Sequence, residues 1–124
     1  MPLAKILDPA RIRQTHNGFG FIPHRFLRDG FLSSLDRTEA QLYLFYVLAA
    51  NRHGSSFYSD RRICDILNLS CEQLRTGRDG LIHKDLICCE ERLCQVLELP
   101  PQPVSSSEQT AVSSFAGLKH RIGR

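Results

Sequence analysis

An almost unbroken apolar run at residues 40–50 constrains the fold of this chain more than any other feature. Only Gln41 interrupts it. Upstream, Asp36 and Glu39 have the spacing of a capping box, in which two side chains hydrogen-bond to the backbone at the start of a helix. The pattern therefore predicts a helix over 37–51 that is apolar on all sides and ends before Gly54.

A helix that is apolar all round has to be covered all round. In a chain of 124 residues, neighbouring helices can cover one face, so the other needs either the N-terminal segment or a second copy. We expect a second copy, and hence a homodimer through helix 37–51. The sequence has no apolar run of about 18 residues and no apolar stretch typical of a secretory signal, which predicts a cytoplasmic protein without membrane association.

Two short helices are predicted downstream of this run. Ser59 can cap a helix over 60–67, and Ser70 can cap a second helix over 71–83. Helical spacing makes their inward residues Ile63, Ile66, Leu67, Leu74, Leu81 and Ile82.

The remaining predicted elements are a helix and short strands. A helix near 24–32 is kept short by Gly30, and residues 55–58 are a strand candidate. Segments 86–89 and 93–99 flank a polar turn, which predicts a hairpin.

The segment 59–87, SDRRICDILNLSCEQLRTGRDGLIHKDLI, resembles a helix-turn-helix followed by the start of a wing. With the lead-in at 21–27, the apolar helix and residues 54–59, about residues 19–99 are similar to winged-helix domains of bacterial transcriptional regulators and plasmid replication initiators. One departure is Asp85, where that family often has glycine. The apolar anchors of the resemblance are Ile63, Ile66, Leu69, Leu74, Leu81, Leu86 and Ile87.

This resemblance implies a mainly α fold with a small β-hairpin, a winged helix-turn-helix, at 19–99. A basic N-terminal arm at 1–18 precedes it, and a Pro/Ser-rich linker with a short basic segment follows at 100–124. The last segment has the spacing of a short amphipathic helix at Ala111, Phe115, Leu118 and Ile122. The resemblance also implies sequence-specific binding of double-stranded DNA, as a transcriptional regulator or a replication-initiator-like factor.

Helix 71–83 is the expected recognition helix. Gln73, Arg75 and Thr76 are residue types that hydrogen-bond to bases or phosphates. Arg11 and Arg13 lie on the arm and are candidates for the minor groove, or simply for a basic chain end. Backbone contacts are expected from Ser59, Arg61, Arg62, Ser70 and Lys84, although the two arginines also suit an ordinary solvated helix start.

Acidic residues in the same region favour an alternative, a non-catalytic winged-helix protein-interaction module. Glu72 and Asp79 fall on the exposed face of helix 71–83, and Glu90 and Glu91 fall in the predicted wing turn. Gly77 and Gly80 are expected to weaken the helix, and Asp79 could pair with Arg75. The net charge of +3 is concentrated in the first 35 and last 25 residues.

The cysteines and histidines do not form a recognisable metal or catalytic motif. The cysteines lack paired C-x-x-C spacing, so we expect buried thiols, with Cys71 as the reactive exception because a helix N-terminus favours a thiolate. A redox or metal-sensing regulator is a minor alternative. Without a Gly-rich phosphate loop, a nucleophile elbow or a placed carboxylate pair, we expect neither an enzyme nor a cofactor. The cysteines are Cys64, Cys71, Cys88, Cys89 and Cys94.

Overall fold

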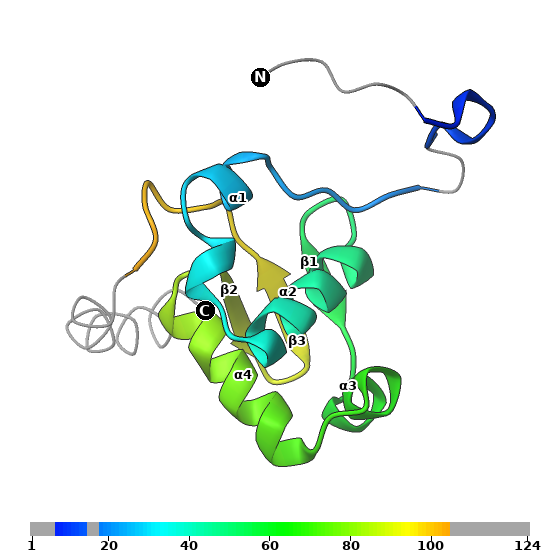
Figure 1. Ribbon diagram of the computed structural model, residues 1–124. Coiled ribbons are helices and arrows are strands. Elements are labelled where there is room, and N and C mark those ends of the chain that lie inside the picture. The colour runs from blue at the N-terminus through cyan, green and yellow to red at the C-terminus, as the bar shows by residue number, and fades with distance from the viewer. Residues whose placement is uncertain (1–6, 15–17, 105–124) are drawn as a thin grey trace.

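Four α-helices and three short strands form the described part of the chain, which in this computed structural model covers residues 7–14 and 18–104. Figure 1 shows α2 at the centre, with α4 along one side and the sheet behind. The elements in order are the 3-10 helix η1 (Pro9–Arg11), α1 (Arg25–Arg28), the 3-10 helix η2 (Leu32–Ser34), α2 (Arg37–Ala49), β1 (Ser55–Phe57), α3 (Asp60–Leu67), α4 (Cys71–His83), β2 (Ile87–Glu90) and β3 (Leu93–Val96).

The three strands form one antiparallel sheet in the order β1-β3-β2. The predicted hairpin is present as β2 and β3, turning at Glu91, which has a positive φ of 54°. The strand candidate at 55–58 is also present as β1, and it pairs with β3 so that Ser56 faces Cys94. The fold is therefore a mixed arrangement of helices around a three-stranded sheet rather than helices with an isolated hairpin.

The core lies where α2, α4 and the sheet meet. At its α1 end, the Phe26 and Tyr43 rings stack with centroids 4.7 Å apart. The chain folds back over α2 here, and Gly20 lies so close that an added Cβ would be 2.8 Å from the Val47 carbonyl oxygen. The largest fully buried side chains are Phe31, Leu42, Tyr46, Ile63, Leu74, Leu81, Leu86 and Ile87.

Two glycines let α4 approach α2 closely. A Cβ at Gly77 would stand 2.7 Å from Leu42 Cδ1 and 2.8 Å from Thr38 Cγ2, and one at Gly80 would overlap the Glu39 carboxylate. Distances below 3.0 Å require the neighbours to move. The sequence-based expectation that these glycines only weaken the helix is therefore incomplete, since they form the seam between two core helices.

Several helix ends in the structure differ from the predicted ones because of the local backbone conformation. The helix expected at 24–32 is divided into α1 and η2, because Gly30 takes a φ of 87° that ends the first helix. Helix α2 stops at Ala49 because Ala50 is extended. Gly54 is not its cap and instead turns the chain into β1 with a φ of 84°. Ile66, expected to face inward, is 46% exposed.

Helix α2 is covered on more sides than expected, but not on all. The chain's own elements bury Leu42, Tyr43, Phe45, Tyr46 and Val47. Leu44 and Leu48 remain 50% and 65% exposed. The N-terminal segment thus covers part of the second face, and one stripe of α2 is left in solvent. No helix in residues 7–14 and 18–104 has the length and apolar character needed to cross a membrane.

Candidate functional site

The helix pair α3–α4 is capped as its serines predict. Ser59 Oγ accepts a hydrogen bond from the Arg62 backbone N–H at 3.2 Å, and Ser70 Oγ accepts one from the Gln73 N–H at 3.0 Å. Between the helices, Asn68 adopts a left-handed conformation with φ 57° and ends α3. Such short polar caps satisfy N–H groups that have no partner inside the helix. The two serine hydroxyls are therefore engaged in the helix ends.

A bidentate ion pair joins the two helices. Arg78 Nη1 and Nη2 donate to the two Asp60 carboxylate oxygens at 2.7 Å and 3.2 Å. Hydrogen bonding between Arg78 and Asp60 lowers the pKa of Asp60 and raises the pKa of Arg78. The Arg78 side chain is mostly buried beside Tyr46. Burial raises the pKa of the Tyr46 hydroxyl, an effect that Arg78 partly offsets. Among the three ion pairs of the described residues, none joins Arg75 to Asp79, although their spacing allowed such a pair.

Four exposed arginines belong to the elements that meet at this ion pair, namely α3, α4 and the β2–β3 turn. The charges of Arg75 on α4 and Arg92 in the β2–β3 turn also lower the pKa of Asp60, so both lie within electrostatic reach of it. Arg61 and Arg62 follow Asp60 in the first turn of α3. We call these four residues, all exposed, the arginine cluster.

Sequence reasoning found three members of the cluster and missed Arg92. It treated the hairpin turn as acidic because Glu90 and Glu91 precede Arg92. The signal that could have found it is position, because Arg92 falls in the turn of the predicted hairpin rather than within a strand. Arg78 was also overlooked, and its role is to hold Asp60 rather than to face solvent.

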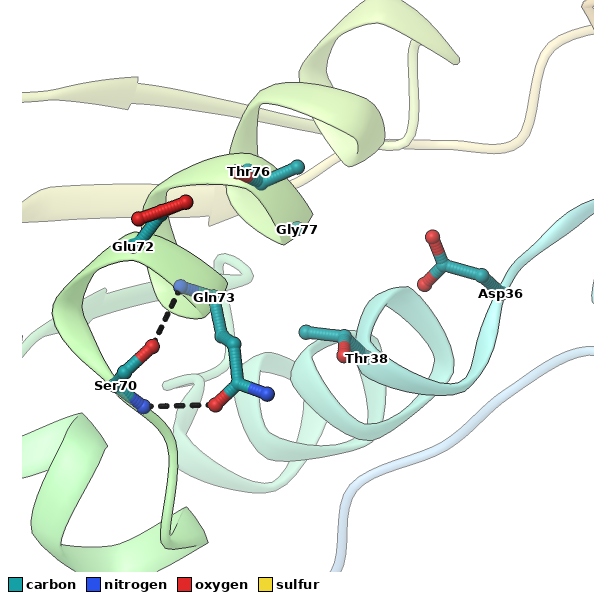
Figure 2. A pocket seen from close by; sticks show the side chains of 7 residues that line it. All are labelled: Asp36, Thr38, Ser70, Glu72, Gln73, Thr76 and Gly77. Carbon is teal, nitrogen blue, oxygen red and sulfur yellow. Dashed lines mark hydrogen bonds between the residues drawn. The ribbon is translucent and has the colours of Figure 1, made fainter.

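A groove of about 540 Å³ lies on the other flank of α4, against the start of α2. Figure 2 shows Gln73 reaching into it from α4, opposite Thr38 and Asp36. The Gln73 Oε1 accepts a hydrogen bond from the Ser70 N–H at 2.9 Å, completing a capping box. Gln73, expected to read bases, therefore uses its carbonyl oxygen within its own helix, whereas Thr76 is exposed and has no such bond in the described part of the chain.

Lys84 was expected to contact the DNA backbone from the surface, but its side chain is largely buried. Its ammonium group donates to the Glu39 carboxylate and, at 2.9 Å, to the Ser34 carbonyl oxygen. The side chains of Lys84 and Glu39 are only 15% and 7% exposed. Burial of a charged carboxylate is tolerated only with a partner. Lys84 is that partner, so it stabilises the α2–α4 junction and is left out of the surface site.

The arm arginines lie far from this arrangement in the chain. Arg11 ends η1 and Arg13 follows it, and both are exposed. Figure 1 shows η1 extended away from the helices and sheet. The expected amphipathic segment at 105–124 lies outside the described residues.

The cysteines divide into a disulfide and three thiols. Cys89 and Cys94, directly opposite each other on β2 and β3, form a disulfide, which corrects the expectation of buried thiols at both positions. Cys71 is exposed, Cys88 is buried, and burial, followed by the proximity of Cys71, raises the pKa of the Cys64 thiol. In the described ranges, no three His, Cys, Asp or Glu side chains are grouped so as to hold a metal ion.

Comparison of the chain with protein-family models, with curated proteins and with solved structures finds no match.

Proposed function

We propose that this protein binds double-stranded DNA through the α3–α4 pair and the β2–β3 turn, as a winged helix-turn-helix. The observation that carries the proposal is the arginine cluster: Arg75 on α4 and Arg92 in the hairpin turn both lie within electrostatic reach of Asp60, and the exposed Arg61 and Arg62 follow Asp60 in the first turn of α3. Arginine is suited to phosphate oxygens because it presents a rigid fork of donors. A transcriptional regulator or a replication-initiator-like factor would use such a surface.

Within this proposal the contacts divide by role. Arg61, Arg62 and Arg92 bind the phosphate backbone, since they lie at a helix start and a hairpin tip. Arg75 and Thr76, exposed on α4, face the bases. Ser59, Ser70 and Gln73 act indirectly by capping the helices that carry these groups. Arg11 and Arg13 are exposed on the arm and remain candidates for a second, minor-groove contact.

The test is a binding titration against mixed-sequence duplex DNA at two salt concentrations. Each phosphate contact contributes about 0.9 to the slope of log K against log salt, so Arg61→Ala with Arg62→Ala should lower affinity for every duplex and reduce the slope by about 2. The matched control is Arg28→Ala, which removes an exposed arginine on α1 and should change neither quantity by as much. Equal binding by the double variant and the wild type would refute this docking.

The second candidate is a protein-interaction module of the same fold. It is favoured by acidic residues beside the cluster: Glu72 and Asp79 are exposed on α4, and Glu90 and Glu91 are exposed near the hairpin tip. Carboxylates repel phosphate and suit a basic protein surface. Absence of DNA binding at low salt, with the protein folded, would favour this second function over the first.

A further inference from the structure

An apolar groove lies on the face of the molecule formed by α1, η2 and α2. It has a volume of about 660 Å³, and its apolar walls include Leu27, Leu32, Ala40, Tyr43 and Leu44. Leu27 is 70% exposed, Leu32 is 41% exposed and Leu44 is 50% exposed. Large apolar side chains gathered on one face, rather than scattered singly, mark a surface that another molecule covers.

A protruding side chain lies directly beside this groove. Ala40, Leu44 and Leu48 are spaced four residues apart, so they form one stripe along α2. Ala40 and Leu44 line the groove, while Leu48, 65% exposed, lies one turn beyond it. A small residue at one end of the stripe and a large exposed residue at the other make the surface complementary to itself.

From these features we infer that the groove receives Leu48 of a second copy of this chain, in a two-fold symmetric dimer with the two α2 helices antiparallel. In an isologous contact each residue pair occurs twice. With Leu44 at the axis, Leu48 of each protomer packs over Ala40 of the other, and the two Leu44 side chains meet.

Charge selects the antiparallel direction. Arg37 begins α2 and is exposed, about two turns before Leu44. Parallel helices would place the two Arg37 side chains together, whereas antiparallel helices separate them by about 20 Å along the axis. Each Arg37 then lies near the C-terminal end of the other α2, where Asn51 follows the helix and the helix dipole favours a positive charge.

The experiment is sedimentation of the full chain at micromolar concentration, in the absence of DNA. The wild type should have about twice the 14.1 kDa monomer mass. Leu48→Lys and Ala40→Glu should each give a folded monomer, checked by circular dichroism. The control Ile66→Lys, which places the same charge at a helical position 46% exposed on α3, should stay dimeric.

Mixing the two monomeric variants gives the sharpest result. Residues 40 and 48 are about 12 Å apart along one helix, so the new charges cannot pair within one chain. Across the interface the new lysine meets the new glutamate at one contact and the native pair forms at the other, so the mixture should regain the dimer mass. A wild-type monomer, a dimeric Leu48→Lys variant or a mixture of folded variants that stays monomeric would each overturn the proposal. Because no DNA is present, these outcomes are independent of the DNA-binding test.

Discussion

At the scale of single residues, the function of a charged side chain depends on contacts that its sequence neighbours do not reveal. Lys84 follows the last residue of α4, yet its ammonium group lies between the Glu39 carboxylate and the Ser34 carbonyl oxygen. Arg92 follows two glutamates, yet its charge reaches Asp60 on another element. Distances across the fold, rather than local charge runs, assign one of these cations to the core and the other to the surface.

Replacement of Lys84 tests the buried pair. Lys84→Met should destabilise the protein by about 3–5 kcal/mol, because it leaves the Glu39 carboxylate buried without a cation. Adding Glu39→Gln should restore part of this loss, since an uncharged amide keeps the capping bond to the Asp36 N–H without a buried charge. Urea denaturation measures both. If the double variant is no more stable than Lys84→Met alone, the loss does not come from an unpaired carboxylate.

At the scale of elements, packing between α2 and α4 reverses an expectation from helix propensity. An exposed Gly-to-Ala change in a helix normally stabilises by about 1 kcal/mol. At Gly77 the new methyl group would meet Leu42 and Thr38 at less than 3.0 Å. Gly77 thus lowers the intrinsic stability of α4 but allows α4 to pack closely against Leu42 and Thr38 of α2.

Gly77→Ala is therefore expected to lower stability despite its better propensity. Overpacking costs about 1–3 kcal/mol, which exceeds or equals the propensity gain. Asp79→Ala is the matched control, because Asp79 is exposed on the same helix and its replacement should be neutral or slightly stabilising. Thermal unfolding of the two variants gives the comparison. A rise in melting temperature for Gly77→Ala would mean that the gain in helix propensity exceeds the cost of the new contacts with Leu42 and Thr38.

The Asp60–Arg78 pair predicts a pH dependence at the α3–α4 junction. Because its folded pKa is lowered, chiefly by the Arg78 hydrogen bond, Asp60 contributes stability above its ordinary pKa of about 3.9. That contribution is lost as the pH falls through the depressed pKa. The Asp60 side chain is 51% exposed, so the effect at pH 7 should be no more than about 1 kcal/mol.

The comparison is between wild type and Asp60→Asn in urea at pH 7 and near pH 2.5. The wild-type advantage should be present at pH 7 and shrink in acid, while Asp79→Asn should differ little from wild type at both pH values. An Asp60→Asn effect that is equal at the two pH values would mean that the carboxylate charge is not what stabilises the junction.

Elements with local signals were predictable, and elements that depend on distant partners were not. Asp36 with Glu39, Ser59 and Ser70 cap their helices as predicted, because a cap depends on residues within one turn. Helical spacing made Ile66 inward, but α3 is covered on too few sides to bury it. The pairing of β1 with β3 joins segments about 40 residues apart, and no local pattern specifies such a pair. In the candidate site, sequence located Arg61, Arg62 and Arg75 but not Arg92.

At the scale of the whole molecule, Arg25 ties the first helix to the segment that leaves the sheet. Its guanidinium donates to the Pro100 and Pro101 carbonyl oxygens at 2.9 Å and 3.0 Å, and to Asp29 at 3.2 Å. The same group lies 5.1 Å from the centre of the Phe31 ring, over its face. We call these contacts of Arg25 with Asp29, Pro100 and Pro101 the clamp. Since α1 also lines the apolar groove, the clamp fixes the position of this side of the groove relative to the rest of the fold.

Arg25→Lys is expected to loosen the clamp although the charge is kept. A lysine ammonium cannot present the planar fork that reaches two carbonyl oxygens and a carboxylate together, so about 1–2 kcal/mol of stability should be lost. Arg28→Lys, an exposed position in the same short helix, is the control and should stay within about 0.5 kcal/mol of wild type. Urea denaturation measures stability, and sedimentation reports whether loss of the clamp also weakens self-association through the groove. Equal stability of Arg25→Lys and wild type would mean that the hydrogen bonds of the Arg25 guanidinium are not what holds α1, and that the stacking of Phe26 on Tyr43 and Phe31 is sufficient.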